Sequence, residues 1–174
     1  MAFSISTLAR IAFGPRPEIT CPRATWIAGV AELCRRSGGY RESGAFLLGV
    51  RDKWRHIEEF VFYDDVDPAA LRNGIVQIDG GRLGALWEHC RNTGREVVAD
   101  VHVHPFGYGQ SRSDRANPII AEVGHIAIIL PDFARGDTLP GRIGIYEYQG
   151  SRRWLDRSGD TASPLHLGCW PAWR

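Results

Sequence analysis

The chain has 174 residues, 44% of them hydrophobic and 24% charged, which suits one folded domain over residues 1–174 and gives no support for extensive disorder. Its 21 Lys and Arg residues nearly balance 20 Asp and Glu residues, so no overall basic field favours nucleic acid or an anionic membrane as a partner. The N-terminal stretch lacks the long apolar segment of a secretory signal, and no run approaches the roughly 20 apolar residues of a membrane span. We therefore expect a cytoplasmic protein.

The first half of the chain predicts a strand, a helix and a hairpin. A first strand is expected at residues 3–13, and residues 22–37 place apolar side chains at helical spacing before two glycines that end the helix. Two apolar stretches, at 44–50 and 56–63, flank a polar segment. This arrangement is typical of a β-hairpin.

The second half alternates between helical and strand patterns. Residues 82–93 repeat large apolar side chains at i, i+3, i+4 and i+7, which predicts an amphipathic helix. The segment that ends at Pro105 alternates in period two and predicts a strand. A short helix capped by Asn117 should follow, and then strands at 125–131 and 141–148. Strands interleaved with helices predict an α/β fold with a mixed sheet flanked by helices.

The four cysteines lie far apart and form no CxxC pair, so neither a zinc ribbon nor a redox pair is indicated. In a reducing cytoplasm they are expected to be free thiols. They are Cys21, Cys34, Cys90 and Cys169.

A candidate metal site ends the strand that precedes Pro105. Because alternate residues of a strand project from the same face, the imidazoles of His102 and His104 can converge on one ion. Asp114 lies ten residues after His104. The glycine-bearing loop between them is long and flexible enough to fold its carboxylate back. Two histidines and one carboxylate leave the fourth position of a tetrahedral zinc open for water, as in catalytic zinc sites.

The same stretch, HVHPFGYGQSRSD, resembles the signature of the JAMM (MPN+, JAB-domain) zinc metalloproteases, which is HxHP followed by a loop and SxxD. Ser111 and Asp114 occupy the last two places. Upstream, QIDGGRLGALWEHCRNTGREVVAD is similar to the helix that leads into the metal-bearing strand of this family. ESGAFLLG is similar to its early strand, where Glu42 precedes a Leu and a Gly. The resemblance covers residues 22–130 and implies the MPN/JAB, cytidine-deaminase-like architecture.

The resemblance also implies roles for these residues. One Zn²⁺ per chain would be held by His102, His104 and Asp114. Glu42 would act as general acid/base, and Ser111 would donate a hydrogen bond to the oxyanion. The implied substrate is the C-terminal tail of ubiquitin or a bacterial ubiquitin-like protein and its conjugates, cut after the terminal glycine. Bacterial relatives occur beside E1- and E2-like enzymes, including antiphage conjugation systems, so such enzymes are the further partners that we expect.

Two other functions remain open. A zinc hydrolase could act on a small molecule, a free peptide or a sulphur-carrier conjugate instead of a protein conjugate. An inactive MPN-type scaffold could only bind a partner, although such proteins generally lack the metal residues that are present here.

Several residues also have structural alternatives. Ser111 could merely cap a helix or order its loop. Asp100 shares the strand face of the two histidines, so it could orient a ligand imidazole or be an ordinary buried polar partner. Three further residues are expected to be structural: His89, Cys90 and His125. Three tryptophans could form a partner-binding surface or pack against the domain: Trp154, Trp170 and Trp173.

Overall fold

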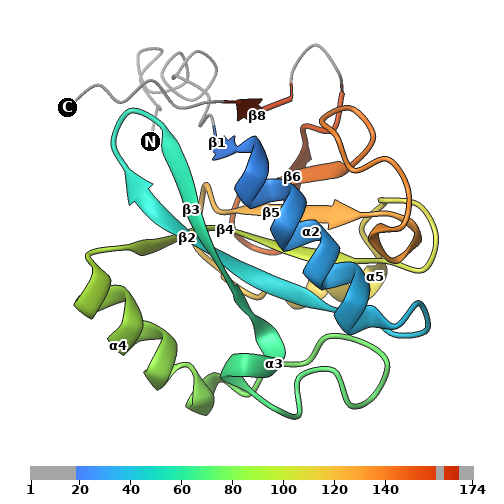
Figure 1. Cartoon of the computed structure of the whole chain (residues 1–174), viewed down its shortest axis with the longest axis horizontal. Helices are drawn as coiled ribbons and strands as arrows, with labels where there is room; N and C mark the ends of the chain where they lie inside the picture. Colours follow the sequence, from blue (N-terminus) through green and yellow to red (C-terminus); the bar gives the residue numbers. More distant parts are fainter. Residues whose placement is uncertain (1–18, 160–162, 169–174) are drawn as a thin grey trace, which may run out of the picture.

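A computed structural model describes residues 19–159 and 163–168, so the strand expected at residues 3–13, Cys169, Trp170 and Trp173 lie outside the described residues. The described strands are β1 (Ile19–Pro22), β2 (Gly44–Arg51), β3 (Arg55–Phe62), β4 (Glu96–Val103), β5 (Ile126–Leu130), β6 (Gly144–Tyr148), β7 (Trp154–Asp156) and β8 (Leu165–Gly168). They form one eight-stranded sheet in the order β7-β6-β5-β4-β2-β3-β1-β8 (Figure 1). The pairs β1–β3, β1–β8 and β4–β5 are parallel and the others antiparallel, so the sheet is mixed.

The helices are α2 (Arg23–Ser37), α3 (Tyr63–Val66), α4 (Gly84–Thr93) and α5 (Arg112–Ala116), with 3₁₀ turns η1 (Gly80–Arg82) and η2 (Asp132–Ala134). The mixed α/β class expected from the sequence is confirmed, as are the hairpin β2–β3 and the two longer helices. Within the described ranges, no helix is long and apolar enough to cross a membrane.

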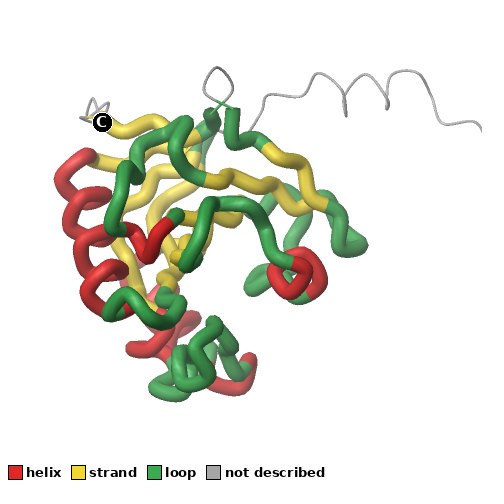
Figure 2. The backbone as a smooth tube through the Cα atoms, turned by 90° about the vertical axis from the view of Figure 1, so that its right-hand side faces the viewer, coloured by secondary structure: helices red, strands yellow, loops and turns green. Residues whose placement is uncertain are grey.

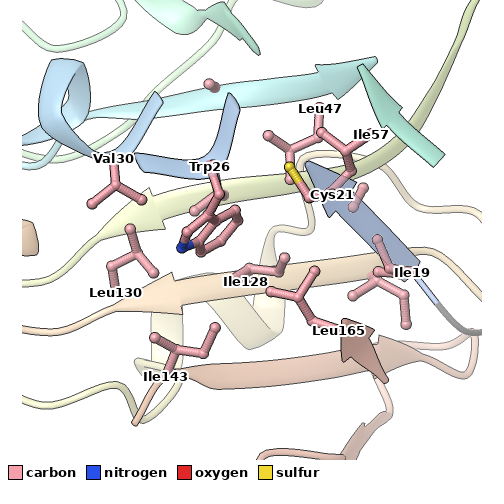
Figure 3. Close-up of a cluster of buried hydrophobic side chains, with 14 of the residues drawn as sticks. Ile19, Cys21, Trp26, Val30, Leu47, Ile57, Ile128, Leu130, Ile143 and Leu165 are labelled. Carbon is pink, nitrogen blue, oxygen red and sulfur yellow. The ribbon is translucent and has the colours of Figure 1, made fainter. Parts of the chain in front are cut away.

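Helix α2 covers one face of the sheet. Its buried residues Trp26, Val30 and Leu33 recur at helical spacing and pack against β2, β4 and β5 in the larger hydrophobic cluster (Figure 3). The indole Nε1 of Trp26 also donates a hydrogen bond to the carbonyl oxygen of Thr138 at 3.1 Å. The helix ends at Gly38, whose φ of 57° is a left-handed conformation that glycine adopts without steric cost.

The second face of the sheet carries a separate hydrophobic cluster and the candidate site. In β2, Leu47 belongs to the cluster under α2, whereas Phe46 packs with Leu86 of α4 in the other cluster. The same alternation in β4 buries Val101 in the cluster under α2, so His102 projects from the opposite face. Figure 2 shows α2 and the short helix α5 on opposite sides of the sheet.

The cysteines of the described ranges are free thiols, as expected: Cys21, Cys34 and Cys90. Burial raises the pKa of the Cys21 thiol to about 12, so it is a packing residue and not a nucleophile. Cys90 is buried in the cluster beneath α4, which agrees with its expected structural role.

The prediction of a helix capped by Asn117 is wrong. Helix α5 begins six residues earlier, because Ser111 and Asp114 form a reciprocal capping box that fixes its start. Asn117 instead ends the helix, and its backbone N–H donates to the carbonyl oxygen of Ser113. Pro118 follows directly, and a residue before proline is disfavoured in the helical conformation.

Candidate metal centre

The two histidines lie at the end of β4, in the middle of the sheet. His102 pairs with Gly44 of β2 on one side and Ile129 of β5 on the other. The backbone N–H of His104 donates to the carbonyl oxygen of Leu130 at 2.9 Å, which continues the alignment past the strand end. Both side chains are buried, and their Nε2 atoms lie 2.9 Å apart. The imidazoles therefore converge as the alternation of the strand predicted.

Asp114 reaches the histidines from the first turn of α5. The Ser111 hydroxyl accepts a hydrogen bond from the Asp114 N–H at 3.1 Å, and the Ser111 N–H donates to Asp114 Oδ2 at 2.7 Å. This capping box fixes the carboxylate, whose Oδ2 lies 3.3 Å from His104 Nε2 and whose Oδ1 lies 3.8 Å from His102 Nε2. Ser111 is thus a helix cap, one of its expected structural alternatives, and its role toward an oxyanion stays a prediction.

The three side chains have the arrangement that a metal ion requires. Their ligand atoms all lie within 4.8 Å of one another. Two donors at 2.0–2.1 Å from a tetrahedral zinc would lie roughly 3.3 Å apart. The separations of 2.9, 3.3 and 3.8 Å bracket that value. His102, His104 and Asp114 could therefore hold a metal ion, and imidazole and carboxylate donors suit zinc and other divalent ions.

The electrostatics of this cluster favour a cation. Burial acts to raise the pKa of Asp114, but the adjacent imidazoles of His102 and His104 outweigh burial and hold that pKa well below its usual range. Burial acts to lower the pKa of His102, but the nearby carboxylate of Asp114 outweighs burial and raises that pKa. Each partner therefore stabilises the charged form of the other, and the carboxylate is ready to accept positive charge from a proton or a metal.

Glu42 lies at the edge of the cluster, just before β2. Its Oε1 is 4.0 Å from His104 Nε2, too far for a direct hydrogen bond. Two backbone contacts with the loop before η1 hold it: the Val76 N–H donates to Glu42 Oε2 at 3.2 Å, and the Glu42 N–H donates to the Gly74 carbonyl at 2.9 Å. Glu42 thus stands beside the three donors, at a distance that suits proton transfer through one intervening water.

A cavity of ≈ 520 Å³ opens over the cluster and is lined by Glu42, His102 and Asp114. The loop and turn at 75–83 form one wall, and residues 110–119 with Trp154 form another. The part of this wall at 75–81 was not predicted from the sequence, which has no strand or helix periodicity there to indicate it.

Asp100 faces the cavity, yet its hydrogen bonds lead away from the ligand imidazoles. Its Oδ2 accepts from the Tyr63 hydroxyl at 3.0 Å, and its Oδ1 lies 2.6 Å from His125 Nε2. All three side chains are buried. Asp100 is therefore a buried polar partner, and His125 is structural as expected. His89 pairs with Glu59 at 2.9 Å on the surface, so it is also a structural residue.

Comparison with known proteins supports the fold. No protein-family model matches the chain. The solution structure of protein DSY2949 from Desulfitobacterium hafniense is similar, with a TM-score of 0.60 over 86% of this chain and 92% of that one. The two sequences are 15% identical, so the likeness extends to the fold alone. The chain therefore shares an α/β architecture with a known structure, and its chemistry has to be argued from its own residues.

Proposed function

We propose that this protein is a zinc-dependent isopeptidase that cuts after the C-terminal glycine of a ubiquitin-like protein. The observation that carries the proposal is the convergence of His102, His104 and Asp114 within 4.8 Å at a cavity that Glu42 also lines. This set matches the residues on which the sequence resembles the JAMM metalloproteases. A bound zinc ion would supply Lewis-acid chemistry to the scissile carbonyl.

Glu42 is the proposed general acid/base. Its carboxylate takes a proton from the attacking water and passes it to the departing lysine amine. The Val76 N–H bond to Oε2 at 3.2 Å orients the carboxylate, which leaves Oε1 directed toward the histidines, 4.0 Å from His104 Nε2. Orientation of this kind reduces the entropic cost of reaching the transition state.

Ser111 is the proposed oxyanion donor. Its oxygen already accepts the cap hydrogen bond from Asp114, but a hydroxyl has one proton to donate as well as its acceptor lone pairs. Ser111 lines the same cavity as His102, so its O–H can be directed into the site. Cap and oxyanion donor are therefore compatible roles for one side chain.

The substrate tail would lie along the cavity in an extended form. Ile75, Ile78 and Leu83 give one wall an apolar surface, and an extended peptide beside it would place the scissile bond near His102. The proposed substrates are conjugates of a ubiquitin-like protein. The proposed further partners are its E1- and E2-like enzymes, and the proposed location of all of them is the cytoplasm.

Metal analysis with a Glu42→Gln variant tests the proposal. Purified wild type should contain one zinc per chain, and Glu42→Gln should keep the zinc but lose at least about 100-fold in cleavage rate, because only proton transfer is removed. Glu58→Gln is the matched control, since Glu58 pairs with Arg95 on the surface. A zinc-free wild type would instead support a binding scaffold, and a fully active Glu42→Gln would remove Glu42 from the mechanism.

The size of the cavity favours a second candidate, a zinc hydrolase of a small molecule or short peptide. A volume of ≈ 520 Å³ lies within the range of roughly 300–1,000 Å³ that is typical of small-molecule sites. Parallel assays of protein conjugates and short tail peptides distinguish the two candidates. Efficient cutting of the peptides alone would favour the second.

A further inference from the structure

We propose that Trp154 and Tyr146, on the hairpin β6–β7, are positioning residues that hold Asp114 at the metal site. This inference rests on the proposed metal function, because it concerns one of the three ligands. Neither residue lies near His102, His104 or Asp114 in the sequence, and neither lies on β4. Each instead donates a hydrogen bond to the segment that carries Asp114.

Trp154 anchors the end of helix α5. Its indole Nε1 donates to the carbonyl oxygen of Arg115, the residue after Asp114, at 3.3 Å. The last carbonyl groups of a helix have no partner within the helix, so this bond satisfies one of them. The ring is itself held in an edge-on contact with Tyr148, with ring centroids 5.0 Å apart. Trp154 also lines the cavity, together with Asp114.

Tyr146 anchors the other end of the segment. Its hydroxyl donates to the carbonyl oxygen of Tyr108 at 3.1 Å, within the loop between His104 and Ser111. The neighbouring strand residue Gly144 lies against the same carbonyl, because a Cβ at Gly144 would be 2.3 Å from the Tyr108 oxygen. The hairpin thus contacts the segment on both sides of the capping box.

Helix α5 needs such support. It has five residues, and isolated helices shorter than about 12 residues are marginal in water. Figure 2 shows it away from α2 and on the other side of the sheet, so the main helix layer does not cover it. The box between Ser111 and Asp114 fixes the carboxylate relative to the helix, whereas Trp154 and Tyr146 fix the helix relative to the sheet that carries the histidines.

The consequence is that these two residues set metal affinity without touching the metal. His102 and His104 are held by backbone pairing in the middle of the sheet, but Asp114 reaches them from a separate segment. Partners that orient a metal ligand typically contribute 10- to 100-fold in affinity.

The test compares zinc affinity, by competition with a chromophoric chelator, in Trp154→Phe, Tyr146→Phe and two controls. Trp154→Phe keeps an aromatic ring but loses the N–H, and Tyr146→Phe loses only the hydroxyl. Each should bind zinc about 10-fold more weakly than wild type. The controls are Leu155→Ala, on the adjacent half-exposed residue of β7, and Tyr148→Phe, which keeps the ring that contacts Trp154 and loses only the hydroxyl that accepts from the Arg152 N–H. Zinc affinity of both controls should stay within about twofold of wild type.

Hydrogen exchange of the metal-free proteins gives a second readout that needs no zinc. Amides of residues 106–116 should exchange about 10-fold faster in Trp154→Phe and Tyr146→Phe, with the sheet unchanged. Unchanged zinc affinity in both variants would overturn the inference. A wild type that binds no zinc would defeat the proposed function and the role toward a ligand together. Amide exchange in residues 106–116 would then test by itself whether Trp154 and Tyr146 anchor this segment. Equal exchange in variants and wild type would overturn the anchoring as well.

Discussion

Substitution of Ser111 by Ala and by Gly separates the two roles of its hydroxyl. Ser111→Ala removes the cap bond to the Asp114 N–H, 3.1 Å long, at a cost of about 1 kcal/mol, whereas glycine at the same helix position costs only a few tenths. If that free energy holds Asp114 in its ligand position, zinc affinity falls about fivefold in Ser111→Ala and by less than about twofold in Ser111→Gly.

Catalysis should respond differently, because both variants lack the O–H donor. If Ser111 stabilises the oxyanion, kcat at saturating zinc falls about 100- to 1,000-fold in both. Chelator competition measures the affinity, and cleavage of a ubiquitin-like fusion measures kcat. A Ser111→Gly variant with wild-type kcat would refute the oxyanion role of Ser111. A Ser111→Ala variant with wild-type zinc affinity would refute the claim that the cap bond holds Asp114 in its ligand position.

Two further predictions concern stability. The raised pKa of His102 contributes stability that is present below its unfolded value of 6.5 and lost as the pH rises through the folded-state value. The melting temperature of chelator-treated protein should therefore fall as the pH rises above about 6.5, and Asp114→Asn should flatten that fall. Constant melting temperatures in wild type across this range would contradict the predicted coupling. Tyr63→Phe removes one of two hydrogen bonds to buried Asp100 and should lower the free energy of unfolding by about 1–3 kcal/mol in urea denaturation, where an unchanged value would show that the bond contributes nothing.

The sequence predicted those parts of the fold that depend on local periodicity. The spacing of Trp26, Val30 and Leu33 indicates one helix face, and the alternation around His102 indicates which side chains share a strand face. The same alternation predicted that His102 and His104 lie together, because residues two apart in a strand project from the same face. The histidine half of the candidate site was therefore predictable from a few neighbouring residues.

Contacts between distant residues could not be predicted in this way. The bonds Trp154–Arg115, Tyr146–Tyr108 and Val76–Glu42 span 39, 38 and 34 residues. No local pattern encodes them, since each depends on how β6, β7 and the loop before η1 fold against the site. The error at Asn117 has a different origin. Two capping signals competed within six residues, and the reciprocal box of Ser111 and Asp114 determined where the helix began.

The candidate centre thus combines parts of unequal rigidity. His102 lies on β4, which is paired on both sides and fully buried at Val101 and Val103, so changes in that core reduce the stability of the whole domain before they move the imidazole. Asp114 and Glu42 come from loop-bearing segments that a few hydrogen bonds hold against the sheet. Substitutions at those bonds should therefore reduce metal affinity or proton transfer while the domain remains folded. For this reason, the proposed metal binding and catalysis can change independently of the stability of the sheet beneath the site.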